Sequence, residues 1–344
     1  MLRQRSGLLL LLLVALALEA CGRAGGRADA SASADASADA SADASADASA
    51  EAEARADAST RDDDDEAYLL GVPRGARSIG HTSVVLKLEL STGKKAVFKP
   101  ASRRGPVRYK GEIAARRLGL ALGLPNVPRV FFRAMDAQAL ASAVGGSTPG
   151  AELFAKEAIV TGNVVKGALM PWIDGLAFLP LEREPLASQW KAWLRKGQTI
   201  PDEQQALARQ VSILVAFDFV TGNWDRWSGG NVGIDKATGI LLFIDNDGAF
   251  FDAPPSDALQ KSKRLLVGID RFSRSFVTRL RELDDEALTR AIGEESPGVP
   301  LLSAKALDGV LQRRKQLLQI LDAKSADHRG TSADAGDDAL LFFP

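Results

Sequence analysis

The stretch from Phe217 to Phe251 reads FDFVTGNWDRWSGGNVGIDKATGILLFIDNDGAFF, and the expected fold is built around it. Its first candidate aspartate, Asp225, follows an apolar run typical of the end of a buried helix, so it is expected in an irregular loop. Its second, Asp245, follows the run ILLFI, which predicts a short buried strand with charge at its end. The turn KATG between them predicts a hairpin that returns the chain beside its start.

Two carboxylates on such elements suit phosphoryl transfer. One can hold Mg²⁺ on the phosphates, and the other can orient the attacking hydroxyl. Either aspartate taken alone is more simply a turn or cap residue, because aspartate is common in turns. Three asparagines in the same short span tilt the interpretation toward a metal-phosphate site: Asn223, Asn231 and Asn246.

The first 20 residues predict a secretory signal peptide, because Arg3 and Arg5 precede an apolar core that ends in LEACG. Cys21 is the only cysteine and stands where a bacterial lipobox carries its lipid, although Glu19 replaces the usual small or apolar residue. We therefore expect an exported lipoprotein, anchored to the membrane of the cell envelope through lipid on Cys21. The alternative is an uncleaved membrane anchor.

Residues 21–66 predict a flexible acidic tether. SADA repeats from Ser33 to Ala50, and residues 22–66 hold 13 acidic and 4 basic side chains, a composition that cannot bury a core. The ordered part of the chain is therefore expected at residues 67–324. It carries a net charge of +10, which suits anionic ligands such as nucleotide phosphates. No nucleic-acid-binding motif stands out, so no nucleic-acid partner is expected.

Cysteine and histidine are too scarce for several kinds of site. One cysteine excludes an intramolecular disulfide, and the two histidines, His81 and His328, leave too few ligands for a structural zinc site. A serine hydrolase would have to use His81, and no GxSxG motif accompanies it.

Strands are expected in the first part of the domain. Apolar alternation and apolar runs predict them at about 85–90, 96–100 and 129–132. Gly80 precedes the first, where it could let the backbone approach a phosphate or simply form a turn. Lys99 ends the second, as either a solvated edge residue or a phosphate ligand.

The segment Gly111 to Leu124 predicts a helix with one broad apolar face. Glu112 lies in its first turn, where it suits the helix dipole and could also hold Lys99 toward phosphates. After residue 132 a polar loop is expected to about Gly150. The later run MPWIDG, residues 170–175, resembles a connector between two lobes, in which Trp172 could line an adenine slot or belong to the core.

Helices dominate the remainder. They are expected at residues 202–219, 271–283, 284–292 and 302–321, with Asp284 and Ser303 as caps. The tail from residue 325 is mostly polar but ends in LLFFP, which could dock on the domain.

Taken in order, these motifs resemble the secreted kinases of the Golgi casein kinase and four-jointed group. More distantly, they resemble the phosphatidylinositol 3-/4-kinases and the HipA toxin kinases. The series comprises a glycine-containing strand, AVFKP, GEIAARRLGLALGLPNVP, an apolar connector, DFVTGNWDR and IDNDGAF, and it spans Gly71 to Leu321.

The resemblance implies an α+β, bilobal protein-kinase-like fold over residues 67–324. A small, mainly β N-lobe with one helix would cover about 67–170, and a larger, mainly α C-lobe about 171–324. Residues 325–344 would form a C-terminal tail.

The resemblance also implies a role for each matching residue. Lys99 would contact the α- and β-phosphates of ATP, and Glu112 would pair with Lys99. Asp225 would be the catalytic aspartate, and Asp245 would bind Mg²⁺ or Mn²⁺. Asn231 resembles the second metal-binding asparagine but lies six positions after Asp225, one more than in the usual pattern.

The nucleotide site would be completed by Gly80, Met170 and Trp172. Trp227 stands where a histidine often follows the DR pair, so the acceptor side is expected to differ. The expected activity is transfer of the ATP γ-phosphoryl group to a hydroxyl of a protein, sugar or lipid. The alternative is a catalytically inactive lipoprotein that keeps the fold to bind a nucleotide or partner, but the presence of all four charged positions favours an enzyme.

Overall fold

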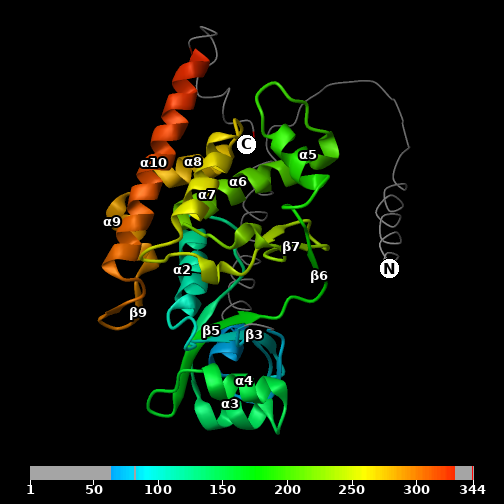
Figure 1. The fold of residues 1–344 in the computed structure, drawn as a ribbon, viewed down its shortest axis with the longest axis vertical. Coiled ribbons are helices and arrows are strands. Elements are labelled where there is room, and N and C mark those ends of the chain that lie inside the picture. The colour runs from blue at the N-terminus through cyan, green and yellow to red at the C-terminus, as the bar shows by residue number, and fades with distance from the viewer. Residues whose placement is uncertain (1–62, 81–82, 330–342, 344) are drawn as a thin grey trace, which may run out of the picture. The chain divides into compact units, whose positions relative to one another are not determined.

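The structure is a computed structural model that describes residues 63–80, 83–329 and 343. The expected signal peptide, the expected lipidation site Cys21, His81, most of the expected tether and most of the C-terminal tail lie outside the described residues. The described residues belong to one compact unit of mixed α and β structure, shown in Figure 1. The expected α+β class is confirmed.

The helical structure begins earlier than expected. Residues 63–70 form a helix, so part of the acidic run that the sequence assigns to the tether belongs to the folded unit. Ion pairs explain the difference, because Asp64 and Asp65 lie 2.5 and 2.6 Å from the guanidinium of Arg129.

A five-stranded antiparallel sheet forms the first part of the domain, in the order β1-β2-β3-β5-β4. Its strands are β1 (Pro73–Ser78), β2 (Leu86–Leu90), β3 (Lys95–Pro100), β4 (Phe131–Asp136) and β5 (Val164–Pro171). In β3, Ala96 and Phe98 are fully buried, whereas Val97 and Lys99 are only partly covered. Because side chains alternate along a strand, Val97 and Lys99 share the opposite face.

Two helices occupy the segment after β4, where a polar loop was expected to about Gly150, and that expectation was wrong. They are α3 (Ala137–Val144) and α4 (Pro149–Glu157). Asp136 and Thr148 cap them by accepting hydrogen bonds from the backbone N–H groups of Ala139 and Ala151, a local signal that the sequence contains. Their apolar side chains pack into one core cluster with Phe98 of the sheet.

Helix α2 (Arg108–Ala121) begins three residues before the expected helix and buries its apolar side against the larger core. A second antiparallel sheet, in the order β6-β7-β8, contains β6 (Leu176–Phe178), β7 (Val232–Asp235) and β8 (Leu241–Phe243). The hairpin between β7 and β8 turns at the expected KATG, where Gly239 adopts a positive φ of 69°.

Helices make up most of the remainder. Those expected from the sequence are α6 (Gln205–Thr221), α8 (Arg274–Glu282), α9 (Asp285–Ile292) and α10 (Ala304–Arg329); α5 (Leu186–Trp193) and α7 (Ser256–Val267) were not expected. Short 3₁₀ turns lie at η1 (Asp202–Gln204), η2 (Arg226–Ser228) and η3 (Asn246–Gly248), and a small hairpin, β9 (Glu294–Ser296) and β10 (Val299–Pro300), separates α9 from α10.

The expected caps are present. Asp284 accepts a hydrogen bond from the N–H of Ala287 at 2.7 Å, and Ser303 accepts one from the N–H of Ala306 at 3.0 Å. Helix α10 continues beyond its expected end at Leu321. Phe343, in the apolar tail, is buried, and its carbonyl accepts a hydrogen bond from the N–H of Arg274.

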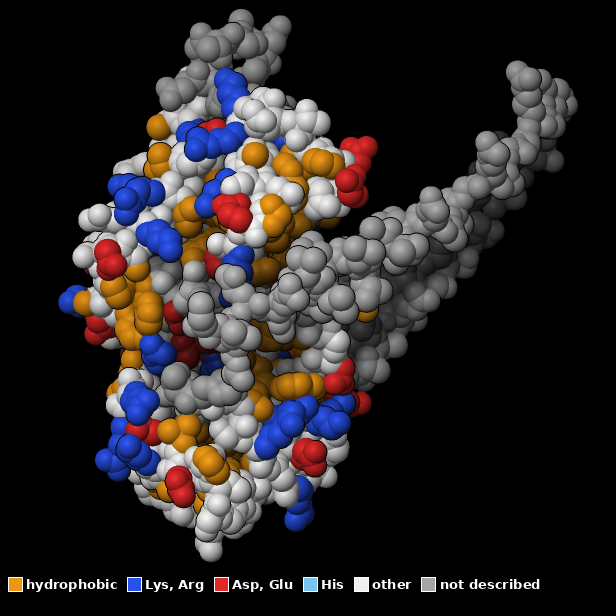
Figure 2. Space-filling model, turned by 45° about the vertical axis from the view of Figure 1, so that its right-hand side comes forward, with side chains coloured by type: hydrophobic (Ala, Val, Ile, Leu, Met, Phe, Trp, Pro, Cys, Tyr) orange, Lys and Arg blue, Asp and Glu red, His pale blue; other side chains and the backbone are white. Residues whose placement is uncertain are grey.

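The basic residues do not gather into one patch on the face shown in Figure 2. Lysine and arginine side chains form several separate groups there, with acidic side chains between them. In the part of the chain that the structure describes, no helix is both long enough and apolar enough to cross a membrane.

Candidate active site

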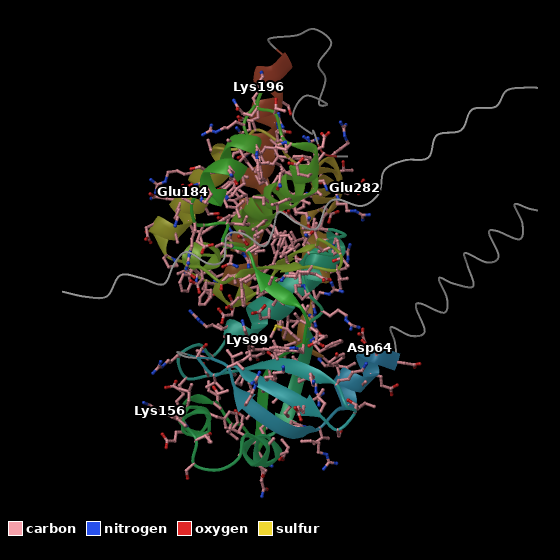
Figure 3. All side chains as sticks on the ribbon, turned by 90° about the vertical axis from the view of Figure 1, so that its right-hand side faces the viewer. Asp64, Lys99, Lys156, Glu184, Lys196 and Glu282 are labelled. Carbon is pink, nitrogen blue, oxygen red and sulfur yellow. The ribbon has the colours of Figure 1, made fainter. Side chains whose placement is uncertain are left out.

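Lys99 is the centre of a charged cluster between the five-stranded sheet and the helical part of the domain (Figure 3). Its Nζ lies 2.5 Å from Glu112 Oε1 and 2.5 Å from Asp245 Oδ1. Only 12% of the Lys99 side chain and 2% of the Glu112 side chain is exposed, whereas 40% of the Asp245 side chain is. The structure therefore brings these three sequence-predicted residues together, with the Asp245 carboxylate as the most open member.

Local structure explains how the three side chains meet. Lys99 is on the less buried face of β3, and Glu112 is in the first turns of α2. Asp245 lies two positions after the end of β8, in the left-handed region at φ 57°, which aspartate tolerates better than most residues. Helix α2 packs directly on the next turn, because a Cβ at Gly111 would lie 2.6 Å from the carbonyl oxygen of Asn246.

A further carboxylate, Asp247, borders this cluster and was given no role from the sequence. It lies 3.9 Å from Lys99 Nζ and 3.5 Å from the guanidinium of Arg108. Three acidic side chains thus surround two cationic ones. The signal was present in the motif IDND, in which a second aspartate follows Asp245 by two positions.

The charged side chains of this cluster shift one another's pKa values. Burial opposes the charged form of Lys99, but the carboxylates of Glu112, Asp245 and Asp247 outweigh it and raise the pKa of Lys99. Burial also opposes ionisation of Asp245, but Lys99 overcomes this and lowers the pKa of Asp245. For Asp247, burial and the neighbouring acids raise the pKa to about 6. The three carboxylates of the cluster therefore carry more negative charge than Lys99 and Arg108 neutralise.

Asp225 lies beside this cluster, in the loop after α6. A Cβ at Gly248 would come within 2.9 Å of the Cβ of Asp225, so the loop packs directly on the turn that contains Asp247. The backbone N–H of Asp225 donates to Asn223 Oδ1 at 3.1 Å. The structure therefore places the Asp225 loop against the turn that follows Asp245.

Asn231 is oriented by the same loop. Its Nδ2 donates to the carbonyl oxygen of Asp225 at 2.7 Å and to Ser228 Oγ at 3.2 Å. Because an amide has one donor group and one acceptor, this leaves Asn231 Oδ1 as the atom that could ligate a metal. The turn η2 and two glycines with positive φ lie between Asp225 and Asn231.

Arg226 organises the loop and was not identified from the sequence. Its side chain is fully buried, and its Nε lies 3.1 Å from both carboxylate oxygens of Asp218. The guanidinium also donates to the carbonyl oxygens of Asn231 and Ile244 and to Asn246 Oδ1. One side chain thus joins α6, the Asp225 loop and the segment after β8. An aspartate inside the apolar end of a predicted helix, followed by a DR pair, was the available signal.

The expected nucleotide-site residues differ in what they contact. Met170 pairs with Val97 across β3 and β5, so it shares the face that carries Lys99. Trp172 is half-buried outside both core clusters, and the ammonium of Lys87 lies 3.4 Å from its ring centroid. Gly80 forms the turn between β1 and β2, where its N–H donates to the carbonyl oxygen of Val85.

The donor set fits a Mg²⁺ or Mn²⁺ ion that is shared with phosphates. Within the described residues, no three Asp, Glu, His or Cys side chains form a ready-made metal cage. Magnesium is usually held by one or two carboxylates together with substrate phosphates and water, so such a cage is not needed. The exposed Asp245 carboxylate and Asn231 Oδ1 would hold the ion, in a region with excess negative charge.

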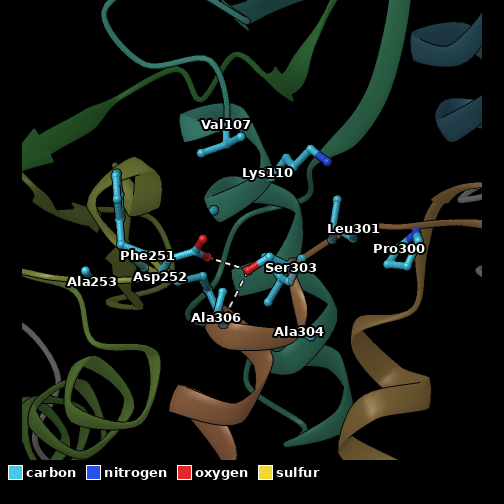
Figure 4. Close-up of a pocket in the computed structure, with 14 residues that line it drawn as sticks. Val107, Lys110, Phe251, Asp252, Ala253, Pro300, Leu301, Ser303, Ala304 and Ala306 are labelled. Carbon is cyan, nitrogen blue, oxygen red and sulfur yellow. Dashed lines mark hydrogen bonds between the residues drawn. The ribbon is translucent and has the colours of Figure 1, made fainter.

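A cavity of about 510 Å³ adjoins the site and shares helix α2 and the segment after Gly248 with it (Figure 4). In it, Ser303 hydrogen bonds to Asp252 and to the backbone of Ala306. Its lining comprises Val107, Lys110, Gly111, the segments 249–253 and 300–304, and Ala306.

Comparison with known proteins supports the fold. No protein-family profile matches the chain, and no curated protein sequence matches it. Among solved structures, a hydra Fam20 with sugar is similar at 16% identity and a TM-score of 0.56, covering 76% of this chain and 88% of its own. A Golgi casein kinase with Mn/ADP bound is similar at 15% identity and a TM-score of 0.57, covering 79% of this chain and 77% of its own. The expected fold is therefore confirmed as the kinase-like fold of Fam20 and the Golgi casein kinase.

Proposed function

We propose that the protein is an ATP-dependent kinase that transfers the γ-phosphoryl group to a hydroxyl of a protein, sugar or lipid. The observation that carries this proposal is the contact of Lys99 with Glu112 and Asp245, which lie 13 and 146 positions away in the chain, beside the Asp225 loop. A lysine for phosphate charge, a carboxylate for the metal and a carboxylate for the hydroxyl are the groups that phosphoryl transfer needs.

Each residue has a defined task in this reaction. Lys99 would bind the α- and β-phosphates, and Glu112 would keep its ammonium aimed at them. Asp225 would orient the acceptor hydroxyl and take its proton as the bond from the acceptor oxygen to the γ-phosphorus forms. The bond from that phosphorus to the bridging oxygen breaks, and ADP leaves.

Asp245 and Asn231 would hold a divalent ion against the phosphates. When bound, Mg²⁺ or Mn²⁺ neutralises charge that develops on the transferred group. The Golgi casein kinase structure with Mn/ADP is consistent with this cofactor choice. Met170 and Val97, on the same face of the sheet as Lys99, would contact the base, and Trp172 would border it once Lys87 moves from its ring.

We also propose that the enzyme is exported and attached to the membrane of the cell envelope through lipid on Cys21. This rests on the sequence, in which a signal-like segment ends at the only cysteine. Labelling with a radioactive fatty acid should mark the wild type but not Cys21→Ser. Equal labelling of the two would refute the lipid anchor.

The kinase proposal is tested by phosphate transfer from γ-labelled ATP to a panel of proteins, sugars and lipids, with Mg²⁺ or Mn²⁺. Lys99→Ala and Asp245→Ala are expected to abolish transfer without unfolding the protein. Lys95→Ala is the matched control, since Lys95 is an exposed lysine of the same strand. Full activity in either site variant would refute the assignment. Nucleotide binding without transfer by the wild type would favour the inactive binding lipoprotein.

A further inference from the structure

A second buried charged cluster joins helix α2, strand β5 and the β9–β10 hairpin, and it centres on Glu295 of strand β9. Only 3% of this side chain is exposed. Its Oε1 accepts hydrogen bonds from Tyr109 Oη at 3.0 Å and from Lys166 Nζ at 2.9 Å, and its Oε2 lies 2.7 Å from Lys110 Nζ. The β9–β10 hairpin, which lies between α9 and α10 in the sequence, thus contacts α2 and β5 through Glu295 (Figure 1).

The same hairpin region contacts α2 at a second point. The guanidinium of Arg117 donates to the carbonyl oxygen of Ile292 at 2.6 Å and to that of Glu294 at 2.8 Å. Tyr109 and Arg117 are eight positions apart, which is about 12 Å along a helix at 1.5 Å per residue. Two contacts at that spacing constrain both the tilt of α2 and its rotation about its axis.

Such a constraint matters because α2 carries Glu112. Tyr109 precedes Glu112 by three positions, so the two side chains are neighbours on the helix surface. We propose that Glu295 is a positioning residue: through Tyr109 and Lys110 it holds α2 where Glu112 reaches Lys99. The inference rests on the proposed kinase function for its catalytic consequence, but its structural part stands on the contacts of Glu295 alone.

The side chains around Glu295 keep its carboxylate ionised and hydrogen-bonded. Burial opposes ionisation of Glu295, but hydrogen bonds from Lys110, Lys166 and Tyr109 outweigh it and lower the pKa of Glu295. Burial and the charge of Glu295 raise the pKa of Tyr109, so its hydroxyl remains a donor. Loss of the Glu295 charge would leave two lysines facing each other across the gap between α2 and β5.

The test compares Glu295→Gln with Glu294→Gln. Glu294 lies in the same hairpin, but its exposed side chain accepts from the N–H of Gly298 at 2.9 Å. Hydrogen–deuterium exchange of residues 108–121 and the affinity for Mn²⁺–ATP would be measured, neither of which requires phosphate transfer. Tyr109→Phe removes a single hydroxyl and keeps the ring, so it serves if Glu295→Gln fails to fold.

We expect Glu295→Gln to speed exchange across α2 and to leave α6 unchanged, with a smaller change of the same sign in Tyr109→Phe. Transfer should fall by ~10- to 100-fold, because a displacement of about 1 Å at a catalytic group has effects of that size. A merely structural role would lower the active fraction and leave the affinity for Mn²⁺–ATP unchanged.

Exchange across α2 that is the same in Glu295→Gln, Tyr109→Phe and Glu294→Gln would overturn the inference, whatever the activity. Absence of transfer in the wild type would instead refute the proposed function, and the exchange and affinity measurements would still decide the role of Glu295.

Discussion

Two largely buried cations, Lys99 and Arg226, have opposite surroundings. Arg226 faces one carboxylate, that of Asp218, and donates its remaining hydrogen bonds to oxygens of the protein itself. Lys99 faces three carboxylates, and one of these is substantially exposed. Protein oxygens accept the hydrogen bonds of Arg226, whereas Lys99 is surrounded by more negative charge than it neutralises.

The difference distinguishes a network that stabilises the fold from one that is suited to binding a ligand. A neutral, closed network such as that of Arg226 stabilises one arrangement of the loops. An open, acidic network such as that of Lys99 favours the arrival of a cation, and phosphates that Lys99 can share would arrive together with that cation. Substitutions in the two networks should therefore affect stability and ligand binding in different proportions.

The largest effect is expected for Arg226→Met. Removal of the guanidinium leaves Asp218 as an unpaired buried charge and removes the donors to three oxygen acceptors, which should cost ~3–5 kcal/mol of unfolding free energy. Chemical denaturation measures the change. Lys99→Met is the comparison, and an equal loss in both variants would erase the distinction drawn between the two cations.

The next effect concerns the divalent ion. At a hundredfold excess over its Kd, Mn²⁺ with ATP should stabilise the wild type by ~2.7 kcal/mol. Asp245→Asn should lose most of this gain, since the exposed carboxylate at the cluster is gone, whereas Asp257→Asn, an exposed position of α7, should retain it. Thermal unfolding with and without the ligands gives both values, and equal gains in the two variants would rule out Asp245 as a ligand.

A smaller effect is expected for Gly111→Ala, which tests how closely α2 packs on the turn after β8. The new methyl group would lie 2.6 Å from the carbonyl oxygen of Asn246, and such overpacking costs ~1–3 kcal/mol. In Gly75→Ala the methyl group would make an ordinary contact, at 3.6 Å from Glu89. Denaturation of the two variants should separate them, and a stability of Gly111→Ala equal to that of Gly75→Ala would contradict the close packing.

The last effect, gradual rather than all-or-none, is a pH dependence from Asp218. Burial raises the pKa of Asp218 from 3.8 to about 6, against the opposing attraction of Arg226. The folded protein therefore binds this proton more tightly than the unfolded chain, so the contribution to stability is complete below pH 3.8 and is lost as the pH rises through about 6. Relative to Asp218→Asn, the wild type should lose up to about 1.4 kcal/mol per pH unit in this window. Parallel pH profiles would show that the pKa is not raised.

Local sequence was sufficient for those parts of the fold and site that depend on short segments. The strand ending in Lys99, the helix carrying Glu112, the KATG hairpin and the loop of Asp225 could each be recognised from a few neighbouring residues. Their order along the chain, compared with a known family, then supplied the expectation that they meet.

Other parts depended on contacts that no local pattern contains. Tyr109 and Glu295 lie 186 positions apart, and neither stands in a motif, so their hydrogen bond could not be predicted. Helices α3 and α4 were missed because the polar, glycine-containing run up to Gly150 suggested a loop, although Asp136 and Thr148 were available as caps. The DR pair and Asp218 gave a local signal for Arg226, but its bonds to the carbonyl oxygens of Asn231 and Ile244 have no signature in sequence.

The most direct measurement is a crystal structure with Mn²⁺ and a non-hydrolysable ATP analogue, in which anomalous scattering locates the metal. We predict a metal peak against the side-chain oxygens of Asp245 and Asn231, with the α- and β-phosphates beside Lys99 Nζ and the γ-phosphate toward Asp225. A nucleotide bound elsewhere on the protein, with Lys99 still enclosed by its carboxylates, would contradict this prediction.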